Sequence, residues 1–168
     1  MADIPNLPPA PEGTPVSKFV HLHVHSDYSL LDGASKITTL IARAKELNMP
    51  ALALTDHGNM FGVLNFEHFC HHNGINPICG EEFYVAEGSH TEKNEIPYTE
   101  NGKHSYYYHL ILLAQNETGY KNLCWLSSKA FTEGMYYKPR IDFELLQKYH
   151  EGIICLSACI QGELPKTL

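Results

Sequence analysis

The stretch FVHLHVHS, residues 19–26, decides the kind of fold that the sequence predicts. Apolar residues and histidines alternate along it, and in a β-strand successive side chains point to opposite faces. The apolar residues would therefore pack into a core. The opposite face would carry three imidazoles, those of His21, His23 and His25. A face of this composition needs water, a metal ion or a phosphate opposite it, so the pattern indicates a polar cleft beside a strand.

The composition fits one globular domain. The chain has 168 residues, of which 43% are hydrophobic, enough for a substantial core. Its 12 basic and 19 acidic residues give a formal net charge of −7, which argues against a basic nucleic-acid-binding surface on this chain. The unusual feature is the presence of 11 histidines, which are scattered along the sequence.

The cysteines and the first residues indicate a reduced, cytoplasmic protein. The five cysteines include no CxxC pair, and we find neither a signal-peptide-like stretch nor an apolar run of about 20 residues. We therefore expect free thiols and no contact with a membrane. Five prolines in the first fifteen positions predict a disordered, proline-rich arm over residues 1–17.

Strand-like and helix-like segments alternate after this arm. Five strands are expected, at 19–26, 50–59, 77–85, 106–114 and 152–160. Four helices are expected, at 35–48, 60–74, 117–134 and 141–150. The polar stretch 86–105 predicts a mobile loop. This order predicts an α/β protein with a mostly parallel sheet, either a barrel or a doubly wound sheet. Because five β units do not close a typical parallel barrel, we expect a truncated one.

Polar side chains gather at one edge of the predicted sheet, because the carboxyl ends of parallel strands lie at the same edge. The strands and one loop bring imidazoles, carboxylates and a thiol there: His23, His25, Asp32, His57, Glu82, His109 and Cys159. Each residue alone has an ordinary explanation, such as a hydrogen-bonded histidine or a small buried cysteine. Together they favour a cluster of metal ions, in which Glu82 bridges two of them.

This set of ligands indicates the metal and the chemistry. Imidazoles and carboxylates with at most one thiolate suit Zn²⁺, Mn²⁺ or Fe²⁺ better than Ca²⁺. Clustered ions of this kind favour phosphoester hydrolysis, since they activate water and hold the phosphoryl oxygens.

Several motifs resemble a known family. HLHVHSDYSLLDG (21–33), LTDHGNMFG (54–62), GINPICGEEFYV (74–85), YHLILLAQNETGYKNL (108–123), FTEGMYYKPRID (131–142) and EGIICLSACIQGELP (151–165) are similar to the PHP (polymerase and histidinol phosphatase) domain that begins bacterial DNA polymerase III α subunits. The resemblance runs from about residue 18 to the end. It implies a distorted seven-stranded β/α barrel with up to three metal ions, truncated here after about five β units. Residues 18–168 would be the first part of this domain, without the polymerase domains.

The resemblance also implies roles for individual residues. Three ligand groups are implied: His23, His25 and bridging Glu82; Glu82, His109 and Cys159; and Asp32 with His57. A late Asp-x-His motif of the family lies beyond residue 168. The catalytic residues, acting through metal-bound water, would be His23, His25, His57 and Glu82. Arg140 is a candidate contact for a substrate phosphate by its charge and its position after Pro139, although a salt bridge on a solvated loop is the more common explanation for such a residue.

Three functions remain open at this point. The family resemblance favours a part of a DNA-directed DNA polymerase, active in DNA replication, with a metal-dependent 3′–5′ proofreading exonuclease site. The second hypothesis is a metal-stabilised scaffold that docks a separate proofreading subunit and has no catalytic activity of its own. The third is a phosphatase for a small phosphomonoester. The implied partners are DNA, other replicase subunits, the sliding clamp and a proofreading subunit.

Overall fold

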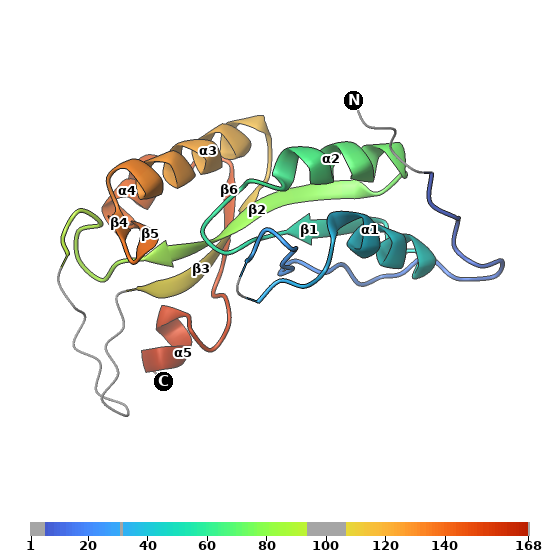
Figure 1. Ribbon diagram of the computed structural model, residues 1–168, viewed down its shortest axis with the longest axis horizontal. Coiled ribbons are helices and arrows are strands. Elements are labelled where there is room, and N and C mark those ends of the chain that lie inside the picture. The colour runs from blue at the N-terminus through green and yellow to red at the C-terminus, as the bar shows by residue number, and fades with distance from the viewer. Residues whose placement is uncertain (1–5, 31, 94–106, 168) are drawn as a thin grey trace.

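The computed structural model describes residues 6–30, 32–93 and 107–167 (Figure 1). This part of the chain forms a six-stranded mixed sheet with helices packed against it, so the expected α/β class is confirmed. The strands follow the order β4-β5-β2-β3-β6, and β1 pairs with β2 outside this path. None of the described helices is long and apolar enough to cross a membrane.

The sheet is organised around one long strand, β2 (Asn76–Val85). On one side, its first four residues pair in parallel with β1 (Ala51–Leu54), and its last two residues pair in parallel with β5 (Lys138–Ile141). On its other side lies β3 (Tyr108–Ala114), which is antiparallel to it. The central strand therefore exchanges one partner for another half-way along one edge.

The expectation of a mostly parallel sheet is wrong. Besides the β2–β3 pair, β3 is antiparallel to β6 (Ile153–Leu156), and β4 (Met135–Tyr136) is antiparallel to β5. A parallel neighbour requires a crossover connection, usually a helix. The sequence between β2 and β3, residues 86–107, is polar and has no helical pattern. In agreement with this, β3 runs along β2 in the opposite direction.

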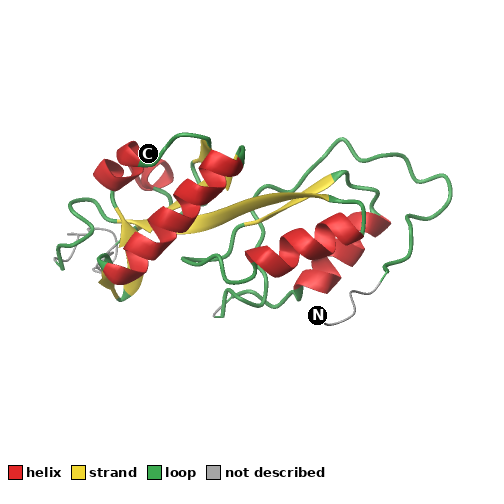
Figure 2. Ribbon diagram, turned by 90° about the horizontal axis from the view of Figure 1, so that it is seen from above, coloured by secondary structure: helices red, strands yellow, loops and turns green. Residues whose placement is uncertain are grey.

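Two hydrophobic clusters pack against the two ends of β2, and the helices that contribute to them lie along different parts of this strand in Figures 1 and 2. The first joins α1 (Ile37–Glu46) and α2 (Val63–His72) to β1 through fully buried Ile41, Leu54 and Phe66. The second joins α3 (Glu117–Thr132) to β2, β3 and β5 through fully buried Leu123, Leu126 and Ile141. Two shorter helices complete the described fold, α4 (Phe143–Lys148) and α5 (Glu163–Thr167).

The segment 19–26 bends at Leu22 and His23 and does not form the regular strand that the alternation predicts. Its backbone contacts the β1 region at only two positions, where the amide of Ala53 donates to His21 and that of Thr55 donates to Val24. The amide of Val24 is bound instead by the side-chain oxygen of Thr55, at 2.9 Å. Because this hydroxyl takes the place of a backbone carbonyl, residues 19–26 and β1 form no continuous ladder of backbone hydrogen bonds.

Other boundaries also differ from the expected ones. The predicted strand 50–59 ends at Leu54, because Asp56 turns to bind the loop 26–29. The short strands β4 and β5 were not expected. The predicted loop 86–105 and the first residues of the predicted strand 106–114 lie partly outside the described residues.

The described part of the predicted arm, residues 6–17, forms no helix or strand but is not loose. The amide of Leu7 donates to the side chain of Asn73, and Lys45 Nζ donates to the carbonyl of Leu7 at 2.7 Å. Farther along, Asn48 donates to the carbonyl of Thr14. These hydrogen bonds hold the segment against the ends of α1 and α2, which differs from the expectation of a disordered arm.

Candidate metal centre

Glu82 lies at the point where β2 exchanges its partners. The pairing with β1 ends at Cys79 and the pairing with β5 begins at Tyr84. Between them the amide of Glu82 donates to the carbonyl of Asp56 at 3.1 Å, and its carbonyl accepts from Gly58 at 2.9 Å. These two bonds fix the backbone of Glu82, and its side chain is fully buried.

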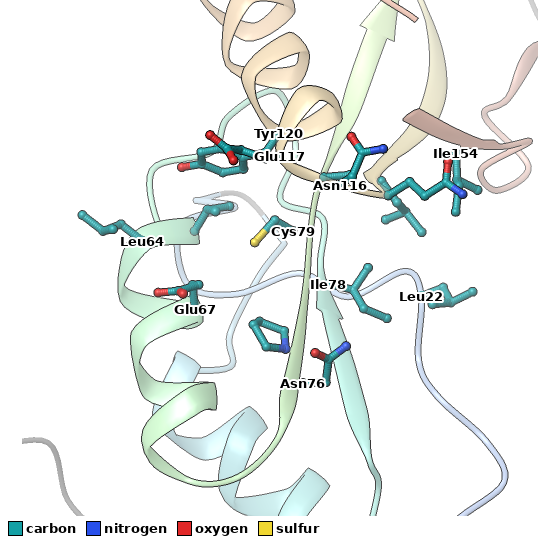
Figure 3. Close-up of a pocket in the computed structure, with 15 residues that line it drawn as sticks. Leu22, Leu64, Glu67, Asn76, Ile78, Cys79, Asn116, Glu117, Tyr120 and Ile154 are labelled. Atoms are coloured by element: carbon teal, nitrogen blue, oxygen red, sulfur yellow. The ribbon is translucent and has the colours of Figure 1, made fainter. Parts of the chain in front are cut away.

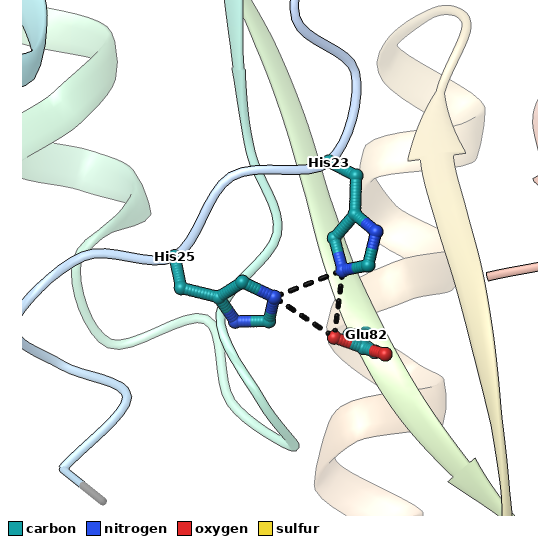
Figure 4. A group of neighbouring side chains, drawn as sticks. All are labelled: His23, His25 and Glu82. Carbon is teal, nitrogen blue, oxygen red and sulfur yellow. Dashed lines mark hydrogen bonds and ion pairs between the residues drawn. The ribbon is translucent and has the colours of Figure 1, made fainter. Parts of the chain in front are cut away.

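Three side chains form a triangle around one carboxylate oxygen. His23 Nε2 lies 2.9 Å from Glu82 Oε2, His25 Nε2 lies 3.0 Å from the same oxygen, and the two nitrogens are 2.9 Å apart (Figure 4). Ring nitrogens bonded to the carboxylate by their own protons cannot also bond to each other. Protons therefore satisfy at most two edges of this triangle, whereas a divalent cation bound by the three atoms would satisfy all of them.

Two more histidines and an aspartate extend the cluster. His57 Nδ1 lies 3.2 Å from Glu82 Oε2, and its Nε2 lies 2.7 Å from Asp32 Oδ2. On the other side of the carboxylate, His109 Nδ1 lies 2.7 Å from Glu82 Oε1. Four imidazoles thus surround one glutamate, and its two oxygens face different neighbours.

The electrostatics of the cluster follow from this crowding. Burial by itself would raise the pKa of Glu82, but hydrogen bonds with His109, His23 and His25 hold that pKa far below its ordinary value, so Glu82 is ionised. For His57, burial lowers the pKa, which favours the neutral, metal-binding form of the ring. The neighbouring Glu81 is fully buried and points to the other face of β2, where burial raises its pKa to about 8.

The buried carboxylate of Asp56 helps to position two of these ligands, His25 and His57. Asp56 accepts hydrogen bonds from the amide of Ser26 at 2.6 Å and from the hydroxyls of Ser26 and Ser29 at 2.8 Å each. The oxygen of Ser29 in turn accepts from the amide of His57 at 3.0 Å and lies 3.3 Å from His25 Nδ1. The network fixes both histidines relative to Glu82.

The residues present fit divalent metal ions. Three groups bring one ligand atom from each member within 4.8 Å of one another: His23, His25 and Glu82; His25, Asp32 and His57; and His57, Glu82 and His109. Ligand atoms at about 2.1 Å around a tetrahedral ion lie about 3.4 Å apart, and the atoms of the first group are somewhat closer together, at 2.9–3.0 Å. In addition, His57 Nδ1 is buried and makes no hydrogen bond. A buried ring nitrogen that faces a carboxylate and has no hydrogen-bond partner is suited to bind a metal ion.

The grouping differs in part from the one that the family resemblance implies. The first group is assembled as expected. Cys159 Sγ lies 3.9 Å from both Glu82 Oε1 and His109 Nδ1, so it is next to the second group, but His57 is the third ligand atom within reach. Asp32 and His57 are together as expected, and His25 joins them.

Arg140 is not placed to contact a substrate. Its side chain is 1% exposed, and it donates to the carbonyls of Gly134 at 3.2 Å and His90 at 3.0 Å. The guanidinium also lies over the ring of Tyr136, 5.1 Å from its centroid. Arg140 therefore ties the segment 90–92 to β5, contrary to the phosphate contact that was predicted.

Two pockets differ in their relation to the cluster. A pocket of about 480 Å³ borders it and is lined in part by Asp32, His57 and His109. A second pocket, of about 750 Å³, lies toward the other end of β2, between α2 and the start of α3, and is lined mainly by apolar side chains (Figure 3). None of the candidate ligands lines this second pocket.

A comparison with models of protein families assigns the chain to one of them. The model of the PHP domain matches residues 21–168. This chain belongs to the PHP domain family. The match includes every candidate ligand described above.

Curated relatives extend this result. The chain is 59% identical over 150 residues to the DNA polymerase III subunit alpha of Treponema pallidum, and 55% identical over 152 residues to that of Borreliella burgdorferi. A third, from Aquifex aeolicus, is 49% identical over 144 residues. These alignments cover 89%, 90% and 86% of this PHP chain but only 12%, 13% and 12% of the relatives. The chain thus spans about an eighth of the length of the relatives that it matches.

Two solved structures are distantly similar. One is an amidohydrolase from Chromobacterium violaceum, at a TM-score of 0.43 and 24% identity, over 66% of this chain and 34% of the other. The other is a putative metal-dependent phosphoesterase from Bifidobacterium adolescentis, at a TM-score of 0.41 and 14% identity, over 70% of this chain and 36% of the other.

Several residues around the cluster did not emerge from the sequence. Ser29 positions two ligands, and Tyr84 and Lys138 line the smaller pocket, whereas Asp56 was expected at this edge beside His57 but not as the residue that holds the ligand loop. Asp56 precedes His57 in the TDH motif, so a signal for it was present. Lys138 lies in the same strand as Arg140, for which the sequence predicted a phosphate contact. In the structure Lys138, and not Arg140, lines the pocket beside the cluster.

Proposed function

We propose that this PHP domain binds a cluster of divalent cations around Glu82 and hydrolyses phosphoester bonds there. The ligands would be His23, His25, Asp32, His57, Glu82 and His109, with Cys159 beside the second group. The single observation that supports this proposal best is the convergence of four imidazoles on one ionised, buried carboxylate. Such an arrangement would be unfavourable without cations or protons to balance it.

The residues of the chain have distinct tasks in this proposal. Divalent ions bound here would supply activated water and neutralise charge on the phosphoryl oxygens. Glu82 holds the ligand groups together through its two oxygens. Asp32 accepts the Nε2 proton of His57, which leaves the Nδ1 lone pair free to face the cluster. Ser29 and Asp56 keep His25 and His57 in place while substrate binds and leaves.

The relatives suggest the substrate and the setting. Because the curated relatives are DNA polymerase III α subunits, we propose that the chain is the PHP domain of such a subunit, in the cytoplasm, and that it removes nucleotides from DNA 3′ ends. Zn²⁺ and Mn²⁺ are the preferred candidates, since the ligands are imidazoles and carboxylates with one thiol nearby. Polymerisation itself would belong to other parts of the parent protein.

A scaffold function is the alternative. It is favoured by one observation, namely that the ligands come from both sides of β2: His57 follows β1, whereas His109 lies on β3. Ions bound between them would stabilise the sheet whether or not they catalyse a reaction. In that case the domain would serve to dock a separate proofreading subunit.

Metal binding and turnover separate these functions. The full chain would be dialysed against Zn²⁺ or Mn²⁺, and its metal content, melting temperature and release of nucleotides from single-stranded DNA would be measured. We expect His23→Ala and His57→Ala each to lower the metal content and abolish turnover. His21→Ala is the matched control, because its ring contacts Phe19 and lies outside the three ligand groups.

Each outcome has a clear meaning. Turnover by the metal-loaded chain would support the hydrolase. A raised melting temperature without turnover would favour the scaffold. Unchanged metal content in both ligand variants would contradict the assignment of the site.

A further inference from the structure

The pocket of about 480 Å³ beside the cluster has an unusual lining for a metal site. Besides the ligands and Ser29, Leu30 and Asn59, it is lined by four aromatic side chains and a lysine: Tyr28, Phe61, Tyr84, Tyr107 and Lys138. We call this the aromatic pocket. Metal ions require none of these side chains, so the pocket is suited to a part of a substrate that the cluster does not hold.

Two tyrosines extend the aromatic surface away from the ligands. The ring of Tyr84 lies parallel to that of His57, with centroids 6.0 Å apart and an angle of 8° between the planes. Tyr107 contacts Tyr84 edge to face at 4.5 Å, and lies parallel to His109 at 5.8 Å. Tyr84 is 5% exposed, so this wall is rigid. A flat group bound against it would lie directly beside the metal cluster.

Phe61 forms an exposed part of the same pocket. Its side chain is 65% exposed and makes a tilted contact with Phe131 at 5.8 Å. The backbone before it is well fixed, because Asn59 accepts a hydrogen bond from the amide of Phe61 and donates to the carbonyls of His57 and Tyr28. A phenyl ring held in water beside a polar cleft offers a stacking surface to a bound planar group.

Lys138 adds a positive charge to the aromatic pocket. Its Nζ lies over the ring of Tyr84, 5.4 Å from the centroid. In residues 6–30, 32–93 and 107–167 no carboxylate forms an ion pair with it. An ammonium group in this position attracts an anion that is separate from the group held by the cluster.

We propose that the aromatic pocket binds the terminal nucleoside of a single-stranded nucleic acid, with its base stacked on Phe61 and a backbone phosphate next to Lys138. The inference rests on the proposed function and names the residues that select its substrate. The volume falls within the range of small-molecule pockets, roughly 300–1,000 Å³. A base in a duplex is already stacked and paired, so a single-stranded end fits best. A small phosphomonoester would leave the aromatic surface in contact with water.

Binding of a labelled oligonucleotide tests the proposal. The probe is a short fluorescein-labelled thymidine oligonucleotide with a terminal phosphorothioate linkage, measured by anisotropy with the full chain and Mn²⁺. Phe61→Ala and Lys138→Gln should each weaken binding at least about fivefold, equivalent to about 1 kcal/mol. Lys138→Gln should also reduce the slope of log affinity against log salt by about 0.7, as expected when one phosphate contact is lost. Phe61→Ala should leave that slope unchanged.

Matched controls and metal analysis keep the two proposals separate. Trp125→Ala and Lys121→Gln remove an exposed aromatic ring and an exposed lysine on α3, and should leave affinity unchanged. Full metal content with an affinity loss confined to the pocket variants would support the nucleoside site. Unchanged affinity in Phe61→Ala, or equal competition by inorganic phosphate and unlabelled oligonucleotide, would overturn it. A chain that takes up no metal would instead overturn the proposed function.

Discussion

The hydroxyl of Ser29 donates a hydrogen bond to the buried carboxylate of Asp56, at 2.8 Å. Through the same oxygen, Ser29 accepts from the amide of His57 and contacts the ring of His25. Neither Ser29 nor Asp56 belongs to the candidate ligands, yet these two residues determine where His25 and His57 lie. Substitutions of these two residues therefore test separately how the positioning of ligands affects metal affinity and how the buried hydrogen bonds affect the stability of the fold.

Ser29→Ala should weaken metal binding more than it weakens the fold. Loss of a group that orients metal ligands typically costs about 10–100-fold in metal affinity. We expect a decrease of this size in Zn²⁺ or Mn²⁺ affinity, measured by competition with a chelating dye. Ser128→Ala is the control, because the Ser128 hydroxyl bonds to the carbonyl of Cys124 on an exposed face of α3. Equal affinity in the two variants would contradict the positioning role.

Asp56→Ala should lower the free energy of unfolding by about 3 kcal/mol, because it leaves the amide of Ser26 and two hydroxyls without their buried acceptor. Urea unfolding without added metal measures this effect. A loss below about 1 kcal/mol would show that water replaces the carboxylate.

Gly33→Ala should disrupt the loop that carries Asp32. A Cβ atom at Gly33 would lie 1.7 Å from the backbone oxygen of Ser26, which cannot move aside as a side chain can. We expect a destabilisation of about 3 kcal/mol, together with a loss of metal affinity. Gly88→Ala is the control, since its nearest contact is the flexible carboxylate of Glu92 at 3.3 Å. A melting temperature equal to that of the control would refute the prediction.

Asp142 should make stability depend on pH in the acid range. Burial alone would raise its pKa, but hydrogen bonds from the amide and ring of His90 and the amide of Leu145 lower it. A lowered pKa in the folded state stabilises the fold above the unfolded pKa, about 3.9, and this contribution is lost as the pH falls through the folded pKa. The difference in unfolding free energy between the wild type and Asp142→Asn should therefore shrink below about pH 4.

Urea unfolding at neutral pH and at several acid pH values checks this. The matched control is Glu144→Gln, an exposed change in the first turn of the same helix. A constant difference between wild type and Asp142→Asn at all pH values would contradict the assignment.

Cys159 should affect the choice of metal more than the presence of metal. Its sulfur lies 3.9 Å from the nearest atoms of Glu82 and His109, beside a group that is already complete without it. Thiolates favour soft ions, so Cys159→Ser should lower the affinity for Zn²⁺ or Cd²⁺ about tenfold and leave that for Mn²⁺ nearly unchanged. Cys155→Ser, an exposed change on β6, is the control. Equal losses for Mn²⁺ and Cd²⁺ would show that the sulfur has no such role.

The α/β class and the convergence of the candidate ligands could be predicted from the sequence, because they depend on local patterns. The periodicity of 63–72 and 117–132 is that of buried helix faces, and the polar residues follow or end short apolar segments. His23 and His25 converge on Glu82 although their segment is not a regular strand.

The role of Arg140 depends on contacts between distant segments, which local patterns do not contain. The antiparallel direction of β3 agrees instead with the missing helical pattern after Val85, although the alternation of strands and helices elsewhere favoured a parallel sheet. For Arg140, the carbonyls of His90 and Glu92, some fifty positions earlier in the chain, determine where the guanidinium lies. A basic residue after a proline looks the same in sequence whether it is solvated or buried.

The exchange of partners along β2 has a mechanical consequence. His57 follows β1 and His109 lies on β3, while Glu82 lies between them on β2. Any twist of β2 at this point would change the distance between these two imidazoles. Cations bound there would hold the two parts of the sheet together and make the sheet more rigid. Removal of the cations with a chelator should therefore lower the hydrogen-exchange protection of backbone amides far from the site.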